Sequence, residues 1–167
     1  MKKLWMLAPI LLAVASAAVG EEPPRAPVNA TFQHLKSLVG EWQGKTPDGK
    51  SVKVSYTLVS DGSALMERLS PVEEGEMISM YAPDGDGVMM THYCSMHNQP
   101  RMRSGAAGAD GALHFQFVDA TNLATPNDAH MDHVTITTPG PDKLVQEWAF
   151  KSGGQVQSEK FSYSRAK

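Results

Sequence analysis

Apolar and polar residues alternate along most of the chain, and Gly, Asp or Pro separates the alternating runs. A period of two is typical of strands that bury one face, and Asp-Gly turns join such strands in antiparallel order. The runs are EWQGK, VKVSYTLV, ALMERLS, MISMYA, VMMTHYCSM, RMRS, LHFQFVDA, HMDHVTIT, KLVQEWAF and VQSEKFSYS. Because closure removes the exposed edges of so long a sheet, the pattern predicts an all-β fold. We expect a closed up-and-down antiparallel barrel of about ten strands.

One segment ahead of these runs has helical spacing instead. Within NATFQHLKSLVG the apolar residues recur every three or four positions, at Phe32, Leu35, Leu38 and Val39. Asn29 or Thr31 can cap the first turn, and Gly40 can end the last one. We therefore predict one short N-terminal helix before the first strand.

The first residues, MKKLWMLAPILLAVASAAVG, have the pattern of a secretory signal peptide. Two lysines precede an apolar run that Pro9 interrupts and that is too short for a membrane span, and small residues follow it. We predict a signal peptide at 1–20, cleaved after Gly20, then a linker at 21–30 and a single barrel domain at 31–167. The protein is expected to be periplasmic or secreted, with no membrane span after the signal is removed.

The net charge and the cysteine content limit the possible binding partners and disulfides. The formal net charge of −3 becomes −5 (−3 − 2) once Lys2 and Lys3 leave with the signal peptide. A mildly acidic surface argues against nucleic acid as a partner. Cys94 is the single cysteine of the sequence, so an internal disulfide is excluded.

The stretch LVGEWQG, residues 38–44, joins the end of the predicted helix to the first strand. It resembles the Gly-x-Trp opening of the calycins, which include the lipocalins, the fatty-acid-binding proteins and the nitrobindin-like barrels. In lipocalins this tryptophan plugs the closed end of the barrel, and an arginine after the last strand packs over it. Trp42 and Arg165 match those two positions, and a guanidinium group stacks well on an indole. The Thr-Asp-Tyr motif of lipocalins is absent, and Thr46 stands where the nitrobindin-type opening has a glycine.

The mature chain as a whole resembles small exported bacterial lipocalin-like proteins of unknown function, through THYCSMHNQPRM and the later HM. Alternation in VMMTHYCSM places Val88, Met90, His92, Cys94 and Met96 on one face of a strand. This face is the more apolar one, so it is expected to point into the barrel. We predict a non-catalytic barrel that binds a small apolar or amphipathic molecule. The expected ligand-binding residues are Tyr56, Met90, His92, Cys94, Phe115 and His130.

Metal or haem handling is the alternative function. Neutral imidazole and thiolate bind zinc or copper, and the candidate ligands are His92, Cys94, His130 and His133. The sequence adds neither a Cys-x-x-Cys nor a His-Glu-x-x-His pair to them. The nitrobindin-like relatives bind haem through a histidine near the C-terminal end. Residues 134–167 contain no histidine, so that arrangement does not carry over to this chain.

Two other interpretations stay open for His92 and Cys94. Both residues can be ordinary interior side chains, with His92 hydrogen-bonded to the segment 119–122 or the segment 130–133. An enzyme is the other interpretation, but a cysteine nucleophile needs a base within hydrogen-bond reach. Residues two apart on a strand are separated by about 7 Å, and the sequence has no Gly-x-Ser-x-Gly elbow. Binding is therefore preferred to catalysis.

Overall fold

The computed structural model describes residues 29–46, 48–71 and 75–167. The predicted signal peptide, and all of the predicted linker except its last two positions, lie outside these residues. No described helix is both long and apolar enough to cross a membrane.

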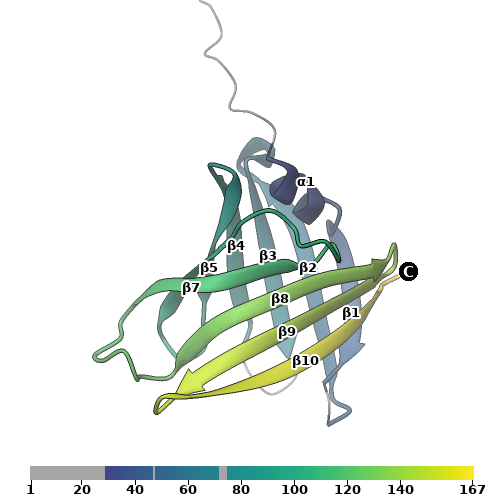
Figure 1. Cartoon of the computed structure of the whole chain (residues 1–167). Helices are drawn as coiled ribbons and strands as arrows, with labels where there is room; N and C mark the ends of the chain where they lie inside the picture. Colours follow the sequence, from purple (N-terminus) through teal and green to yellow (C-terminus); the bar gives the residue numbers. More distant parts are fainter. Residues whose placement is uncertain (1–28, 47, 72–74) are drawn as a thin grey trace, which may run out of the picture.

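The strands of the described chain form one closed barrel (Figure 1). They are β1 (Gly40–Lys45), β2 (Ser51–Val59), β3 (Ala64–Pro71), β4 (Met77–Asp84), β5 (Gly87–Tyr93), β6 (Gln99–Ser104), β7 (Leu113–Thr121), β8 (His130–Gly140), β9 (Lys143–Ser152) and β10 (Gln155–Arg165). Each strand pairs antiparallel with the next one in the chain, and β10 pairs with β1 to complete the ring. The prediction of a closed up-and-down barrel with about ten strands is confirmed.

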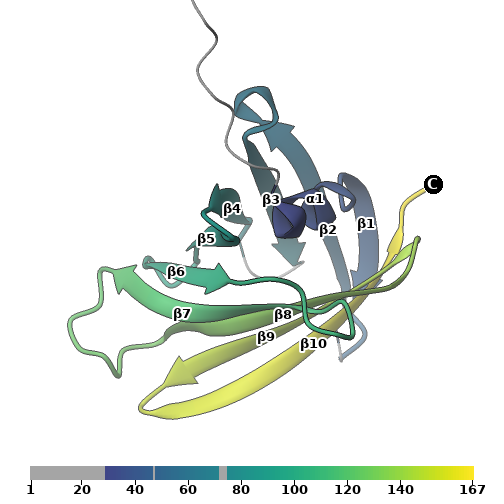
Figure 2. The same ribbon diagram turned by 45° about the horizontal axis from the view of Figure 1, so that its top comes forward.

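Helix α1 (Ala30–Lys36) lies at one end of the barrel. Viewed toward this end, the helix sits between the wall that contains β1 to β3 and the wall that contains β7 to β10 (Figure 2). Asn29 caps the helix, because its side-chain oxygen accepts a hydrogen bond from the backbone N–H of Phe32 at 2.8 Å. The amide of Asn29 also donates to the carbonyls of Gly85 and Gly87, which ties the helix to the turn between β4 and β5.

Trp42 closes the barrel beneath this helix. It is 1% exposed, and its indole N–H donates to the carbonyl of Leu38 at 2.8 Å. The guanidinium carbon of Arg165 lies 4.1 Å from the indole centroid, so the predicted stacking of Arg165 on Trp42 is confirmed. Gly40 has φ +126, and a Cβ there would lie 3.0 Å from the Arg165 guanidinium, so the backbone angle and the close arginine both favour glycine.

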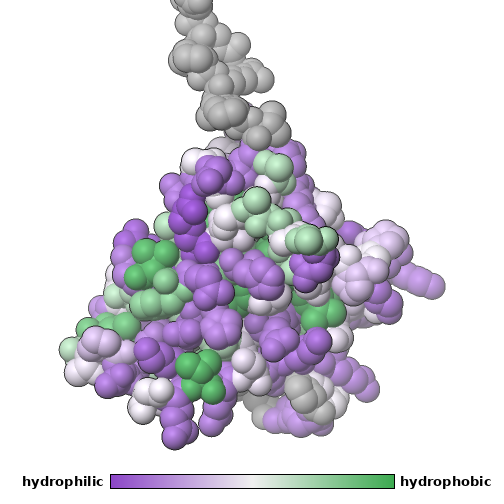
Figure 3. Space-filling view, viewed as in Figure 1, coloured by the Kyte–Doolittle hydropathy of each residue, from purple (hydrophilic) through white to green (hydrophobic). Residues whose placement is uncertain are grey.

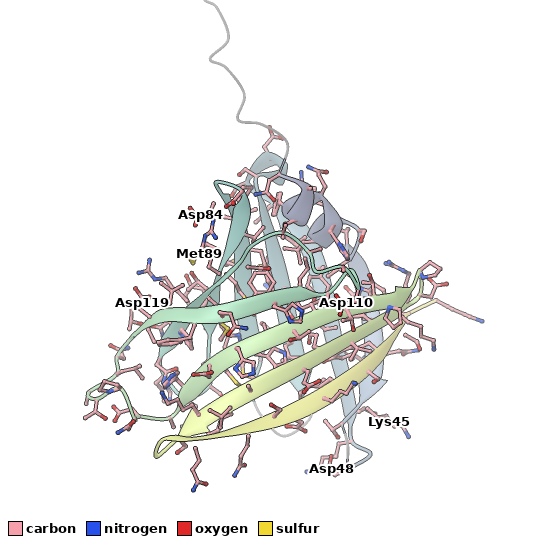
Figure 4. All side chains as sticks on the ribbon, viewed as in Figure 1. Lys45, Asp48, Asp84, Met89, Asp110 and Asp119 are labelled. Atoms are coloured by element: carbon pink, nitrogen blue, oxygen red, sulfur yellow. The ribbon has the colours of Figure 1, made fainter. Side chains whose placement is uncertain are left out.

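The side of the barrel seen in Figure 3 is mostly hydrophilic, with apolar residues in small groups. Asp84 and Asp119 project outward from the strands (Figure 4) and form ion pairs with Arg103 and Arg101. These pairs lie in water, where each stabilises the fold little.

Candidate functional site: a cavity in the barrel

A cavity of about 710 Å³ lies inside the barrel. Strands β2, β3, β4, β8, β9 and β10 each contribute apolar side chains to its wall, including Val52, Leu69, Met77, Met131, Trp148 and Phe161. His92 near the end of β5, and Cys94 just beyond it, add a polar and a sulfur-bearing group. A mainly apolar wall with few polar groups is typical of small-molecule sites.

The cavity occupies the end of the barrel opposite α1. Met77 begins β4 and His92 is near the end of β5, whereas the turn that contacts the helix lies at the other end of both strands. Met96, Gln157 and Glu159 border the cavity and are exposed to solvent. The cavity therefore opens to water at this end, while α1 and the stacked indole cover the other.

Two of the six predicted ligand-binding residues, His92 and Cys94, line this cavity. Three of the others lie in the packed core and do not line the cavity, although they are at most 1% exposed: Tyr56, Met90 and Phe115. The alternation that predicted an inward face for His92 and Cys94 is confirmed by their burial, at 1% and 9% exposed.

His92 lines the cavity, and one of its ring nitrogens is buried without a partner among the described residues. Its Nδ1 lies 3.0 Å from the hydroxyl of Ser79, and its ring centroid is 4.8 Å from that of Trp148. Its Nε2 is buried and has no hydrogen-bond partner among the described residues. Burial lowers the pKa of His92 to about 4, so the ring is neutral at neutral pH. The prediction that its partner comes from 119–122 or 130–133 is wrong, because the adjacent strand β4 supplies Ser79.

A buried carboxyl group, which was not among the predicted site residues, lies deeper in the barrel. Glu67 is 0% exposed, and its oxygens accept hydrogen bonds from the hydroxyl groups of Tyr56 at 3.2 Å and Tyr81 at 2.5 Å. The amide of Gln146 donates to the same carboxylate at 2.5 Å, and Ser79 also hydrogen-bonds to it. Burial raises the pKa of Glu67, while these four hydrogen bonds oppose that rise.

Gln146 connects this carboxylate to the opposite wall of the barrel. Its amide oxygen accepts hydrogen bonds from the indole of Trp148 at 3.3 Å and from the hydroxyl of Tyr163 at 3.2 Å. Burial raises the pKa of Tyr163, so its hydroxyl stays protonated. Because Trp148 also lines the cavity, the polar network reaches the inner end of the cavity.

The predicted metal ligands do not converge. Within the described residues, no group of three His, Cys, Asp or Glu side chains is arranged to hold a metal ion. His130 is 1% exposed, packs on Phe117 with 4.7 Å between ring centroids, and has its Nδ1 2.6 Å from the carbonyl of Asp128. The Nδ1 of His133 instead pairs with its neighbour Asp132 at 2.8 Å. A shared metal centre of His92, Cys94, His130 and His133 is therefore not present in this geometry.

The comparisons with known proteins inform the fold. No protein-family model matches the chain, and a search of curated proteins found no match. The crystal structure of Rv2717c from M. tuberculosis is similar with a TM-score of 0.60 and 14% identity, covering 84% of this chain and 100% of that one. A protein of unknown function in the DUF3598 family, from Nostoc punctiforme PCC 73102, is similar with a TM-score of 0.53 and 16% identity. That match covers 79% of this chain and 49% of the other. At such identities the likeness shows the barrel fold alone, and the lipocalin-like resemblance stays a prediction.

Proposed function

We propose that this barrel binds a small, mainly apolar or amphipathic molecule in its cavity and does not catalyse a reaction. The observation that carries the proposal is a cavity with mainly apolar walls, to which the buried imidazole of His92 contributes. A volume of about 710 Å³ falls within the range of small-molecule sites, about 300–1,000 Å³.

Two features support binding over catalysis. The polar groups below the cavity bond to one another, so Glu67 and Gln146 are already occupied by tyrosine, serine and tryptophan donors. The Nδ1 of His92 is likewise engaged by Ser79. A ligand in the cavity therefore meets mainly apolar side chains, together with polar ones such as Ser95, Gln157 and Ser158.

Titration with N-phenyl-1-naphthylamine, a neutral dye that fluoresces in apolar surroundings, tests the proposal. We expect saturable fluorescence with the wild-type chain. Gln157→Trp, at the cavity border, should weaken binding at least about tenfold by filling the opening. Val156→Trp is the matched control, because Val156 lies on the same strand, is exposed and is absent from the described lining. No saturable binding, or equal binding by both folded variants, would count against the cavity as a binding site.

His92 also favours a second candidate ligand, which is haem. A neutral imidazole is the form that ligates iron, and His92 is a neutral imidazole that lines the cavity and has Nε2 without a partner among the described residues. A haem held there would depend on β5 rather than on the C-terminal histidine of the nitrobindin-like relatives. Titration with haemin distinguishes the two candidates: a shifted Soret band that His92→Phe abolishes would replace the small organic ligand by haem.

A further inference from the structure

We propose that the cavity selects amphipathic molecules that carry one positively charged ammonium group, and that this group lies beside Glu159 while the apolar part fills the interior. This inference rests on the proposed function and names the chemical class of the ligand. Its basis is one patch of the inner wall, where a carboxylate lies among three aromatic side chains.

The patch spans the strands β9 and β10, which pair side by side in the barrel wall (Figure 1). Trp148 of β9 lies directly opposite Glu159 of β10, and Phe150 lies opposite Gln157. Phe161 follows Glu159 by two residues, so it shares the same strand face. All five residues line the cavity. Glu159 therefore has one aromatic neighbour across the sheet, one diagonal to it and one along its own strand.

The spacing of these residues suits an organic cation. Opposite residues of an antiparallel pair have Cβ atoms about 4.5–5.5 Å apart, and diagonal neighbours lie about 7–8 Å apart. The face of an aromatic ring attracts a cation within about 6 Å of the ring centroid. An ammonium group beside the carboxylate is thus within reach of the neighbouring rings, which add to the attraction of opposite charges.

The charge of the lining agrees with a cationic ligand. Glu159 is exposed, so it is ionised at neutral pH, and the described residues that line the cavity include no lysine or arginine. His92 also lines the cavity, but burial lowers its pKa to about 4, so it adds no positive charge at pH 7. Lys160 follows Glu159 in the chain, but alternation turns it to the outer face, where it lies opposite Glu147. The lining therefore attracts a cation and repels an anion.

The exposure of the patch determines how the ligand is oriented. Gln157 and Glu159 are exposed, Phe161 is partly buried, and Trp148 is 3% exposed. An ammonium group beside Glu159 keeps part of its hydration, which avoids much of the cost of burying a charge. The apolar part of the ligand then extends past Trp148 to the buried apolar wall, where it leaves water.

Three naphthalenes with different head groups provide the test: 2-naphthylmethylamine, 2-naphthylmethanol and 2-naphthoate. At pH 7 the first is a cation, the second is neutral and the third is an anion. Each is titrated against N-phenyl-1-naphthylamine bound to the wild-type chain, and the loss of fluorescence gives its Kd. We expect the amine to bind about five- to twentyfold more tightly than the alcohol, and the carboxylate to bind more weakly than the alcohol.

Glu159→Gln removes the charge and keeps the shape of the side chain. In this variant the preference for the amine over the alcohol should fall at least about threefold. Glu147→Gln is the matched control, because it removes the same charge from an exposed position that is absent from the described lining. The preference should be unchanged in this control. An equal loss in both variants would overturn the inference, because the total charge of the protein would then explain the preference.

Phe150→Leu tests the aromatic part of the patch. It keeps an apolar side chain and removes a ring that lies diagonal to Glu159. The preference for the amine should fall about twofold or more, while the Kd of the alcohol changes little. An unchanged preference would overturn the role of this ring in binding the cation.

The failure of this inference is distinguishable from the failure of the proposed function. If the dye does not bind to the wild-type chain, the proposed function fails and this inference fails with it. If the dye binds, but the alcohol or the carboxylate displaces it as well as the amine does, only the ligand class is overturned. The wild-type ligand series decides this even if a variant does not fold.

Discussion

His92 is a neutral ring in the folded barrel and a titrating one in the unfolded chain. Burial lowers its pKa to about 4 from the ordinary 6.5. Between pH 4 and pH 6.5 the imidazole of His92 binds a proton in the unfolded chain but not in the folded one. The contribution of the neutral ring to the free energy of unfolding is therefore fully present above pH 6.5 and is lost as the pH falls toward 4. The difference of 2.5 (6.5 − 4) corresponds to about 3 kcal/mol, at about 1.4 kcal/mol for each pH unit.

We predict that the free energy of unfolding of the wild-type chain falls by about 3 kcal/mol more than that of His92→Phe between pH 7 and pH 4. Urea unfolding at a series of pH values measures the difference. The comparison with the variant is needed because Glu67 acts in the opposite direction: its raised pKa makes ionisation unfavourable in the fold, and that penalty is relieved as the pH falls. Parallel pH profiles for the two proteins would contradict the assignment to His92.

The inward position of His92 could be predicted from the apolar residues Val88 and Met90 on the same strand face. The position of its partner was also readable, because the two-residue turn after Asp84 pairs Asp84 with Gly87 and so fixes Ser79 opposite His92. Extended along the hairpin, that register predicts Ser79 as the partner, in place of the segments 119–122 and 130–133.

Glu67 and Gln146 were missed for a related reason. Leu65 and Leu69 flank Glu67 on one strand face, as Leu144 and Trp148 flank Gln146, and all are buried. A polar residue on an apolar face is the same pattern that singled out His92. That two such residues from β3 and β9 bond to each other could not be predicted, because it depends on how the barrel closes.

At the scale of elements, the stacked indole joins the first strand to the last. Arg165 donates to the carbonyl of Val39 at 2.9 Å and to that of Ser37 at 3.2 Å, so it also satisfies the carbonyls that follow α1. Its planar group makes these bonds while lying over Trp42. A lysine cannot reproduce both contacts.

We predict that Trp42→Ala lowers the free energy of unfolding by about 3–5 kcal/mol, because it removes a large core side chain. Arg165→Lys should lower it by about 1–2 kcal/mol through lost hydrogen bonds and stacking. Chemical denaturation of both variants measures these losses. Lys151→Arg, on the outer side of the barrel, is a control that should change stability little. An unchanged stability of Arg165→Lys would show that its contacts are dispensable.

In strand β8, the alternation of residues along the sequence does not predict which side chains share a face. The sequence placed His130 and Asp132 on one face, and Met131 and His133 on the other. The pairing with β9 shifts between Met131 and His133, so one extra residue changes which side chains share a face. Nothing in the run HMDH marks this irregularity, so the convergence of its histidines with His92 could not be tested from the sequence.

At the scale of the whole molecule, the buried polar network links strands that are not neighbours in the sheet. Gln146 of β9 donates to Tyr56 of β2 at 2.7 Å and to Glu67 of β3, across the interior of the barrel. These bonds connect the two walls at the level where the cavity ends. Because these hydrogen bonds satisfy it, a carboxyl group can lie in an otherwise apolar core.

We predict that Glu67→Ala lowers the free energy of unfolding by about 3–5 kcal/mol, because several buried donors lose their acceptor together. Tyr163→Phe removes one hydrogen bond to Gln146 and should cost about 1 kcal/mol, which makes it a matched control. Thermal and urea unfolding of the two variants measure the contrast. Equal, small losses would show that the network contributes little beyond filling space.

The helix, Trp42 and Arg165 cover one end of the barrel, and the cavity reaches solvent at the other. A molecule bound in the cavity would arrive and leave through this opening. A molecule held there as we propose would keep one end at the opening, and that end could lengthen into water without disturbing the part inside. The inner wall would then determine which molecules are held, and the residues at the opening would determine how quickly they exchange.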